Sequence, residues 1–147
     1  MNNTHQKNST AEDVISAKSA PSILIVEDEQ LVRWSLSHAL TKAGFNITTV
    51  STGEIAMEKL NSCHFDLVIT DVNLPQLNGI EVAIQVKKCS PHVPVILTSA
   101  HGEEESRKKI EMDMIDSFIE KPFDLNDVTT IVTQLLSEKK EAFHANL

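Results

Sequence analysis

Cysteine is scarce in this sequence, and the two that occur, Cys63 and Cys89, stand far apart. Their spacing fits neither a metal site nor the disulfide framework of a small secreted protein. No apolar run approaches the roughly 20 residues that span a bilayer, and the N-terminus lacks the charged and apolar regions of a signal peptide. The sequence therefore predicts a cytoplasmic protein that is not inserted in a membrane and keeps both thiols reduced.

Positive charge is also in short supply, with 13 lysines and arginines against 21 acidic residues and a net charge of −8. This balance argues against direct binding of nucleic acid or anionic lipid, because both attract basic surfaces. It leaves open which protein partners bind. The length of 147 residues and the 41% hydrophobic content fit one domain with its own core.

Adjacent apolar residues are nearly absent from the first 20 positions, which hold mostly polar residues and alanine. Such a segment cannot bury enough surface to become ordered. We therefore predict a flexible N-terminal tail over residues 1–20, one domain over residues 21–138, and a C-terminal tail over residues 139–147.

Strand-like and helix-like patterns alternate from Pro21 onward. Short apolar runs predict strands at 23–26, 45–50, 65–70, 95–98 and 117–119. Helical spacing follows each run, at 31–40 before Gly44, at 55–60 after Ser51 and Thr52, at about 80–87, at 103–112, and from Asp124 or Asn126 to Leu136. This alternation predicts an α/β fold in which five parallel strands alternate with five helices.

Polar residues stand where four of the predicted strands end. In a parallel sheet these carboxyl ends meet at one edge, where ligands bind. The residues are three acids, two hydroxyls and one ammonium: Glu27, Asp28, Asp71, Thr98, Ser99 and Lys121. Carboxylates suit Mg²⁺, and an aspartate can accept a phosphoryl group as a mixed anhydride. The combination indicates a Mg²⁺ and phosphoryl site with Asp71 as the nucleophile.

Each of these residues alone has an ordinary explanation. Asp71 would fit a turn or an N-cap, and acids at 27 and 28 would favour the start of the next helix. Lys121 would fit a solvated surface charge, but near three carboxylates it would hold a phosphoryl oxygen. Its bond to Pro122 is a candidate for the cis form. The residues alone leave open whether Thr98 or Ser99 supplies the hydroxyl.

The sequence resembles the receiver domain of response regulators, the CheY-like module of two-component signalling. The resemblance covers about residues 22–137 and is carried by ILIVEDE at 23–29, DLVITDVNLP at 66–75 with Asn78-Gly79, PVILTSAH at 94–101 and FIEKPF at 118–123. It implies a flavodoxin-like, doubly wound sheet of strand order 2-1-3-4-5.

The resemblance also implies a metal site and a phosphoacceptor. Asp71 would take a phosphoryl group from a phosphohistidine on a histidine kinase or a histidine phosphotransfer protein. Mg²⁺ would be bound by the carboxylates of Asp28 and Asp71 and by the backbone carbonyl of Asn73. Glu27, where the family more often has Asp, would act through water, and Lys121 would contact the phosphoryl group.

A switch is implied by two further positions. Ser99, rather than Thr98, would be the switch hydroxyl, because the family places it just before a small residue, here Ala100. Phe118 occupies the position of the switch aromatic, whose burial changes with phosphorylation. The face formed by the fourth helix (103–112), the last strand and the final helix would then bind an effector protein or form a homodimer. Met114-Ile115, where the family often has Gly-Ala, leaves the geometry of that face open.

The sequence leaves open how such a receiver would pass on its signal. The sequence carries no DNA-binding domain of its own, which fits a stand-alone regulator or phosphorelay intermediate. Residues 31–36 (LVRWSL) resemble the first helix of receivers attached to σ54-dependent activators, so an excised receiver is an alternative. An ordinary amphipathic helix with Trp34 as a packing residue would explain the same stretch.

An Asp-nucleophile phosphatase is a third reading. A haloacid-dehalogenase-like hydrolase would want a second acid two residues after the nucleophile, where this chain has Asn73. We expect a signalling switch whose enzymatic activity is at most its own phosphorylation and dephosphorylation.

Overall fold

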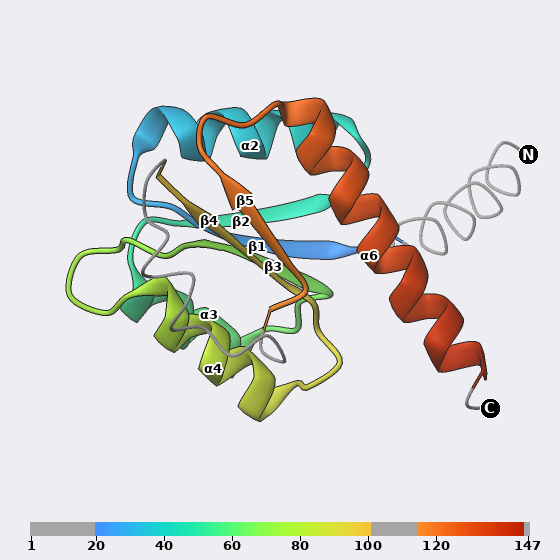
Figure 1. Cartoon of the computed structure of the whole chain (residues 1–147). Coiled ribbons are helices and arrows are strands. Elements are labelled where there is room, and N and C mark those ends of the chain that lie inside the picture. The colour runs from blue at the N-terminus through green and yellow to red at the C-terminus, as the bar shows by residue number, and fades with distance from the viewer. Residues whose placement is uncertain (1–19, 101–114, 146–147) are drawn as a thin grey trace, which may run out of the picture.

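The computed structural model describes residues 20–100 and 115–145 and has one parallel sheet with helices on both faces (Figure 1). The strands are β1 (Ser22–Val26), β2 (Asn46–Val50), β3 (Leu67–Asp71), β4 (Val95–Ser99) and β5 (Ser117–Glu120). They are hydrogen-bonded in the order β2-β1-β3-β4-β5, and each neighbouring pair is parallel. The predicted doubly wound sheet and its strand order are confirmed.

β3 is the middle strand, and its five residues are all buried. A continuous apolar run is typical of a parallel strand covered on both faces. The edge strand β2 is mostly half-buried or exposed, which matches its weaker apolar pattern. β3 and β4 each continue one residue beyond the predicted end. Asp71 and Ser99 are therefore the last residues of their strands, rather than residues of the following loops.

Four helices lie within the described ranges: α2 (Gln30–Lys42), α3 (Gly53–Ser62), α4 (Gly79–Cys89) and α6 (Leu125–Ala145). Helices α2 and α6 cover one face of the sheet, and α3 and α4 cover the other (Figure 1). The predicted helix at 103–112 and almost all of the predicted N-terminal tail fall outside the described residues. Among the helices that are described, none is long and apolar enough to cross a membrane.

The helix boundaries follow from capping residues in the sequence. The Thr52 hydroxyl accepts a hydrogen bond from the Ile55 backbone N–H at 3.2 Å, as expected of an N-cap. Asn78 does the same for α4, accepting from the Glu81 N–H at 3.0 Å. Gly44 follows α2 with φ of 101°, a conformation that favours glycine at a helix end. Asp124 immediately precedes α6, and its carbonyl accepts from the Val128 N–H.

Two apolar clusters fill the space between the sheet and its helices. Alternate strand residues such as Leu24, Val68 and Leu97 pack with α3 and α4. The residues between them, including Ile25 and Ile69, pack with α2 and α6. This alternation fixes the face of the sheet to which each residue at the strand ends belongs.

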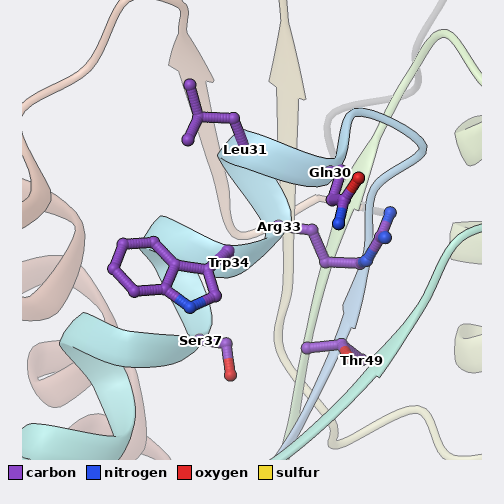
Figure 2. Close-up of a pocket in the computed structure, with 6 residues that line it drawn as sticks. All are labelled: Gln30, Leu31, Arg33, Trp34, Ser37 and Thr49. Atoms are coloured by element: carbon purple, nitrogen blue, oxygen red, sulfur yellow. The ribbon is translucent and has the colours of Figure 1, made fainter.

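Two sequence predictions are corrected by the structure. Helix α6 continues to Ala145, so the predicted end of this helix at Leu136 is wrong. Trp34 does not pack in the core, because it is 62% exposed and stacks on His38 with ring centroids 5.1 Å apart. Trp34 and Leu31 instead line a surface groove of about 510 Å³, and Thr49 of β2 lies on its other side (Figure 2). The buried residues of α2 are Leu36 and Leu40.

Candidate functional site

The carboxyl edge of the sheet brings together four of the predicted site residues. Glu27 and Asp28 directly follow β1, Asp71 ends β3, and Lys121 directly follows β5. Because β1 and β3 are adjacent, the first three residues lie side by side. Their carboxylates offer oxygen atoms that all lie within 4.8 Å of one another.

Lys121 connects the two buried acids of this group. Its Nζ lies 2.6 Å from Glu27 Oε1 and 2.8 Å from Asp71 Oδ2. Glu27 is 1% exposed and Asp71 is 5% exposed. Two carboxylates this close and this buried would repel each other strongly, and the ammonium between them offsets that repulsion. The Lys121–Pro122 peptide bond is cis.

The remaining carboxylate oxygens accept hydrogen bonds from the backbone. Glu27 Oε2 accepts from the Glu29 N–H at 3.1 Å, and Asp71 Oδ1 accepts from the Asn73 N–H at 3.0 Å. Each buried carboxylate therefore has one oxygen that accepts from a backbone N–H and another that accepts from the Lys121 ammonium. This arrangement fixes the orientation of both side chains before any ligand binds.

Arg33 is a residue of this site that the sequence analysis did not single out. Its Nη1 donates to the carbonyl of Glu27 at 2.9 Å and, at a longer 3.4 Å, to the carbonyl of Asp28. The guanidinium thus joins the first turn of α2 to the chain that carries both acids. It also adds positive charge beside an acidic site.

Burial raises the pKa of the Glu27 carboxyl from 4.5 to about 7, and the nearby charge of Asp71 acts in the same direction. The hydrogen bonds from Lys121 and Glu29 oppose this rise without cancelling it. For Lys121, burial alone would lower the pKa, but the hydrogen bonds to Asp71 and Glu27 outweigh it. The pKa of the ammonium is therefore raised above 10.5, and Lys121 is charged at neutral pH.

The donor set fits a hard divalent cation. Of three carboxylates within reach of one another, Glu27 and Asp71 are buried and Asp28 is exposed to solvent. Mg²⁺ is usually bound by one or two carboxylates and keeps several waters, and this set can supply both the carboxylates and an open side for water. Excess negative charge at such a site is relieved by a cation. Asn73 lies two residues after Asp71, in the loop after β3, and its N–H donates to Asp71 Oδ1.

Ser99 and Phe118 share one face of the sheet. Phe118 pairs in register with Leu97, two residues before Ser99, and both Leu97 and Phe118 belong to the cluster on the α3 and α4 side. Asp71 pairs in register with Thr98, on the opposite face. Ser99 is 2% exposed, and its carbonyl accepts from the Lys121 N–H at 2.7 Å. Ser99 and Phe118 therefore lie on the same face of the sheet, and the backbone of Ser99 is hydrogen-bonded to that of Lys121.

A mainly apolar groove of about 440 Å³ opens beside Lys121. Residues of α2 line one part of it, including Leu31 and Val32, while Pro122 and Phe123 line another. The groove is an apolar surface next to the charged site.

A doubly wound fold with acids and a lysine at the carboxyl edge is that of the CheY-like proteins. The sequence model of the response regulator receiver domain matches residues 23–133. The chain belongs to this family.

Relatives of the chain differ in their overall function. It is 29% identical over 117 residues to the DNA-binding transcriptional regulator NtrC of Klebsiella pneumoniae, covering 80% of this chain and 25% of that protein. It is 30% identical over 142 residues to the autoinducer 1 sensor kinase/phosphatase LuxN of Vibrio campbellii, covering 94% of this chain and 16% of LuxN. The chain thus spans a quarter or less of the length of these two relatives.

Solved structures show the same fold. A response regulator receiver protein of Sinorhizobium medicae is 33% identical with a TM-score of 0.75, over 82% of this chain and 98% of that chain. NtrX of Brucella abortus is 27% identical with a TM-score of 0.80, over 86% of this chain and 29% of that chain.

Proposed function

We propose that this receiver is phosphorylated on Asp71 and acts in the cytoplasm as a phosphorylation-dependent signalling switch. The observation that carries the proposal is the buried Asp71 carboxylate, held at 2.8 Å by Lys121 and close to the carboxylates of Glu27 and Asp28. The donor is a phosphohistidine on a histidine kinase or a histidine phosphotransfer protein. An oxygen of Asp71 forms the new bond to phosphorus, the bond from phosphorus to the imidazole nitrogen breaks, and the nitrogen takes up a proton.

The side chains of the site divide the work of this transfer. Lys121 is hydrogen-bonded to one oxygen of Asp71. After the transfer it would be near enough to stabilise the negative charge of the phosphoryl oxygens. Asp28, Asp71 and the Asn73 carbonyl would hold Mg²⁺, with Glu27 acting through water. When bound, the cation would offset the negative charge on the phosphoryl group. The apolar groove beside Lys121 would receive the donor protein.

The switch depends on a change of charge at Asp71. Phosphorylation adds negative charge and new acceptor oxygens, which draw in Lys121 and the Ser99 hydroxyl. Because Ser99 and Phe118 share one face of the sheet, movement of Ser99 would change the surroundings of the aromatic ring. β5 and α6, with the segment 103–112 that lies outside the described residues, would then bind an effector protein or a second copy.

The test is incubation with acetyl phosphate and Mg²⁺ followed by intact mass spectrometry. We expect one added phosphoryl group that is stable in acid and labile in base, and none in the Asp71→Asn variant. Asp66→Asn is a suitable control, because Asp66 lies at the opposite end of β3. Label that persists in Asp71→Asn would contradict the proposal, and continuous release of phosphate from esters would favour an Asp-nucleophile phosphatase.

A second candidate function is control of transcription as the receiver part of a longer activator. The identity of 29% to NtrC and of 34% to the regulatory protein AtoC of Escherichia coli favours it. Sequencing the gene and its flanks tests this candidate. A reading frame that continues into a DNA-binding region would support it, and a stop codon after Leu147 would contradict it.

Mg²⁺ affinity is expected to rise with pH. Glu27 has a pKa of about 7 in the folded protein and an ordinary value of 4.5 when unfolded, so between these values the metal-free folded state binds the extra proton. The contribution of Glu27 to metal-free stability is thus fully present below pH 4.5 and is lost as the pH rises through about 7. A cation at the acidic site favours the ionised form of Glu27. We expect the dissociation constant for Mg²⁺ to be about fivefold to tenfold lower near pH 8 than near pH 6.

Isothermal titration calorimetry at both pH values measures this effect. The Glu27→Gln variant cannot ionise at this position, so its dissociation constant should vary much less with pH. Equal Mg²⁺ affinity of the unaltered protein at the two pH values would contradict the assignment of Glu27.

A further inference from the structure

The loop between β3 and α4, residues 72–78, is joined to helix α3 at a point away from the acidic site. Glu54, in the first turn of α3, accepts a hydrogen bond at its Oε1 from the backbone N–H of Leu77 at 3.2 Å. Gly53 lies directly against the same residue, since a Cβ at Gly53 would lie 2.5 Å from Leu77 Cδ2 and 2.7 Å from the Leu77 carbonyl oxygen. The start of α3 therefore holds Leu77 by both packing and a hydrogen bond.

The same loop is fixed at its other end to the phosphoacceptor. The Asn73 N–H donates to Asp71 Oδ1 at 3.0 Å. The Gly79 N–H donates to the Val72 carbonyl at 2.9 Å, which brings the two ends of the loop together. A loop held at both ends and at Leu77 has little freedom to move the Asn73 carbonyl.

The backbone at Gln76 indicates that this conformation needs support. Gln76 has φ of 65°, in the left-handed region that residues with side chains rarely adopt. Such a conformation persists where the surroundings determine it. The neighbouring residue Leu77 is the one held by Glu54 and Gly53, so this contact is the support nearest to the strained residue.

We infer that Glu54 is a positioning residue for the phosphorylation site, which by holding the Leu77 N–H keeps the Asn73 carbonyl where a divalent cation at Asp28 and Asp71 can bind it. The inference rests on the proposed function, because that function assigns the cation site. Glu54 itself touches neither the cation nor the phosphoryl group. Its influence passes through the backbone of residues 73–77.

The chemistry of the contact suits this role. A carboxylate that accepts from a backbone N–H makes a charge-assisted hydrogen bond, which is stronger than a neutral one. The first turn of a helix also favours a negative side chain, so the position of Glu54 in α3 stabilises the same carboxylate that binds the loop. Glutamine keeps an acceptor oxygen at the same position, whereas alanine removes it.

Three variants separate positioning from general effects of charge and stability. Glu54→Ala removes the acceptor, Glu54→Gln keeps it, and Glu58→Ala removes one negative charge from an exposed residue one turn further along α3. For each, calorimetry gives the Mg²⁺ dissociation constant, amide hydrogen exchange reports on residues 72–78, and thermal unfolding gives the stability. Phosphorylation of the unaltered protein is measured in parallel.

We expect Glu54→Ala to weaken Mg²⁺ binding about threefold to tenfold and to speed amide exchange in the loop. Glu54→Gln should restore most of both properties, and Glu58→Ala should change neither. A lower melting temperature in Glu54→Ala with unchanged Mg²⁺ affinity would show a merely structural role and overturn the inference. A loss that glutamine does not rescue would also overturn it.

The outcome for the unaltered protein distinguishes the two proposals. If it binds Mg²⁺ and is phosphorylated on Asp71 while Glu54→Ala behaves identically, only the positioning role is wrong. If the unaltered protein neither binds Mg²⁺ nor accepts a phosphoryl group, the proposed function fails and the positioning role fails with it.

Discussion

Replacing Lys121 with methionine is expected to lower the free energy of unfolding by roughly 3 kcal/mol near pH 8 without Mg²⁺. The variant leaves Glu27 and Asp71 buried next to each other without the ammonium that lies 2.6 Å and 2.8 Å from them. Removing one partner of a buried ion pair costs more than the pair contributes, because a charge stays buried without compensation. Urea unfolding followed by circular dichroism measures the change.

Two conditions should reverse much of this loss. Near pH 5 the Glu27 carboxyl is protonated in the folded protein, since its pKa is already raised to about 7 with Lys121 present. Mg²⁺ should also restore stability, and it should bind more tightly to the variant because the competing ammonium is gone. An equal loss at both pH values, with no recovery in Mg²⁺, would contradict the electrostatic explanation.

Lys139→Met is the matched control for this substitution. Lys139 lies 3.8 Å from Asp66 Oδ1, and both side chains are more exposed than the Lys121 group. Ion pairs at the surface contribute at most about 1 kcal/mol. A much smaller effect at Lys139 would show that burial at the acidic site, rather than loss of a lysine, accounts for the instability of the Lys121 variant.

Replacing Gly79 with alanine is expected to destabilise the fold by about 2–4 kcal/mol. A Cβ at Gly79 would overlap the carbonyl oxygen of Asp71 and lie 2.7 Å from its carbonyl carbon. Alanine has the better helix propensity by about 1 kcal/mol, but an overlap with backbone atoms of the middle strand cannot be relieved by a side-chain rotation. Helix α4 must move away from β3, or Asp71 must move with its strand.

Thermal and urea unfolding measure this loss, and acetyl phosphate labelling measures its effect on Asp71. Gly44→Ala is the control: Gly44 has φ of 101°, but no atom lies within 4 Å of the added Cβ. Its cost is conformational only, about 1–2 kcal/mol. If Gly79→Ala proved as stable as the unaltered protein, the close approach of α4 to Asp71 would be wrong.

The sheet was predictable because each of its strands has a distinct apolar run. The run at β3 is buried on both faces and β2 lies at an edge, as their patterns indicate. The length of α6 was not predictable in the same way. Residues 139–145 show no apolar periodicity, but a helix already anchored by packing adds one hydrogen bond for each further residue.

The orientation of α2 also could not be settled from spacing. Leu31 and Trp34 fit a helical stripe, but so do Val32, Leu36 and Leu40, which are offset from them by a fraction of a turn. Only the second stripe faces the sheet, and Leu31 is 70% exposed. Periodicity identifies an amphipathic helix, whereas packing decides which of two adjacent stripes is covered.

Within the site, sequence motifs located the charged side chains and missed those that bind the backbone. Glu27, Asp71 and Lys121 follow strands whose positions were predictable, and the structure brings them together. Arg33 donates to backbone carbonyls and Glu54 accepts from a backbone N–H. Every residue carries a carbonyl and nearly every residue an N–H. A side chain that binds the backbone therefore has no distinctive partner residue by which the contact could be recognised in the sequence.

The surface position of Trp34 has a consequence for how this protein is observed in solution. The chain has one tryptophan and no tyrosine, so its ultraviolet emission reports on a single site on α2. That indole is already mostly in water and stacks on His38. A fluorescence signal from this protein therefore reports on the surface of α2 more than on the burial of side chains in the core.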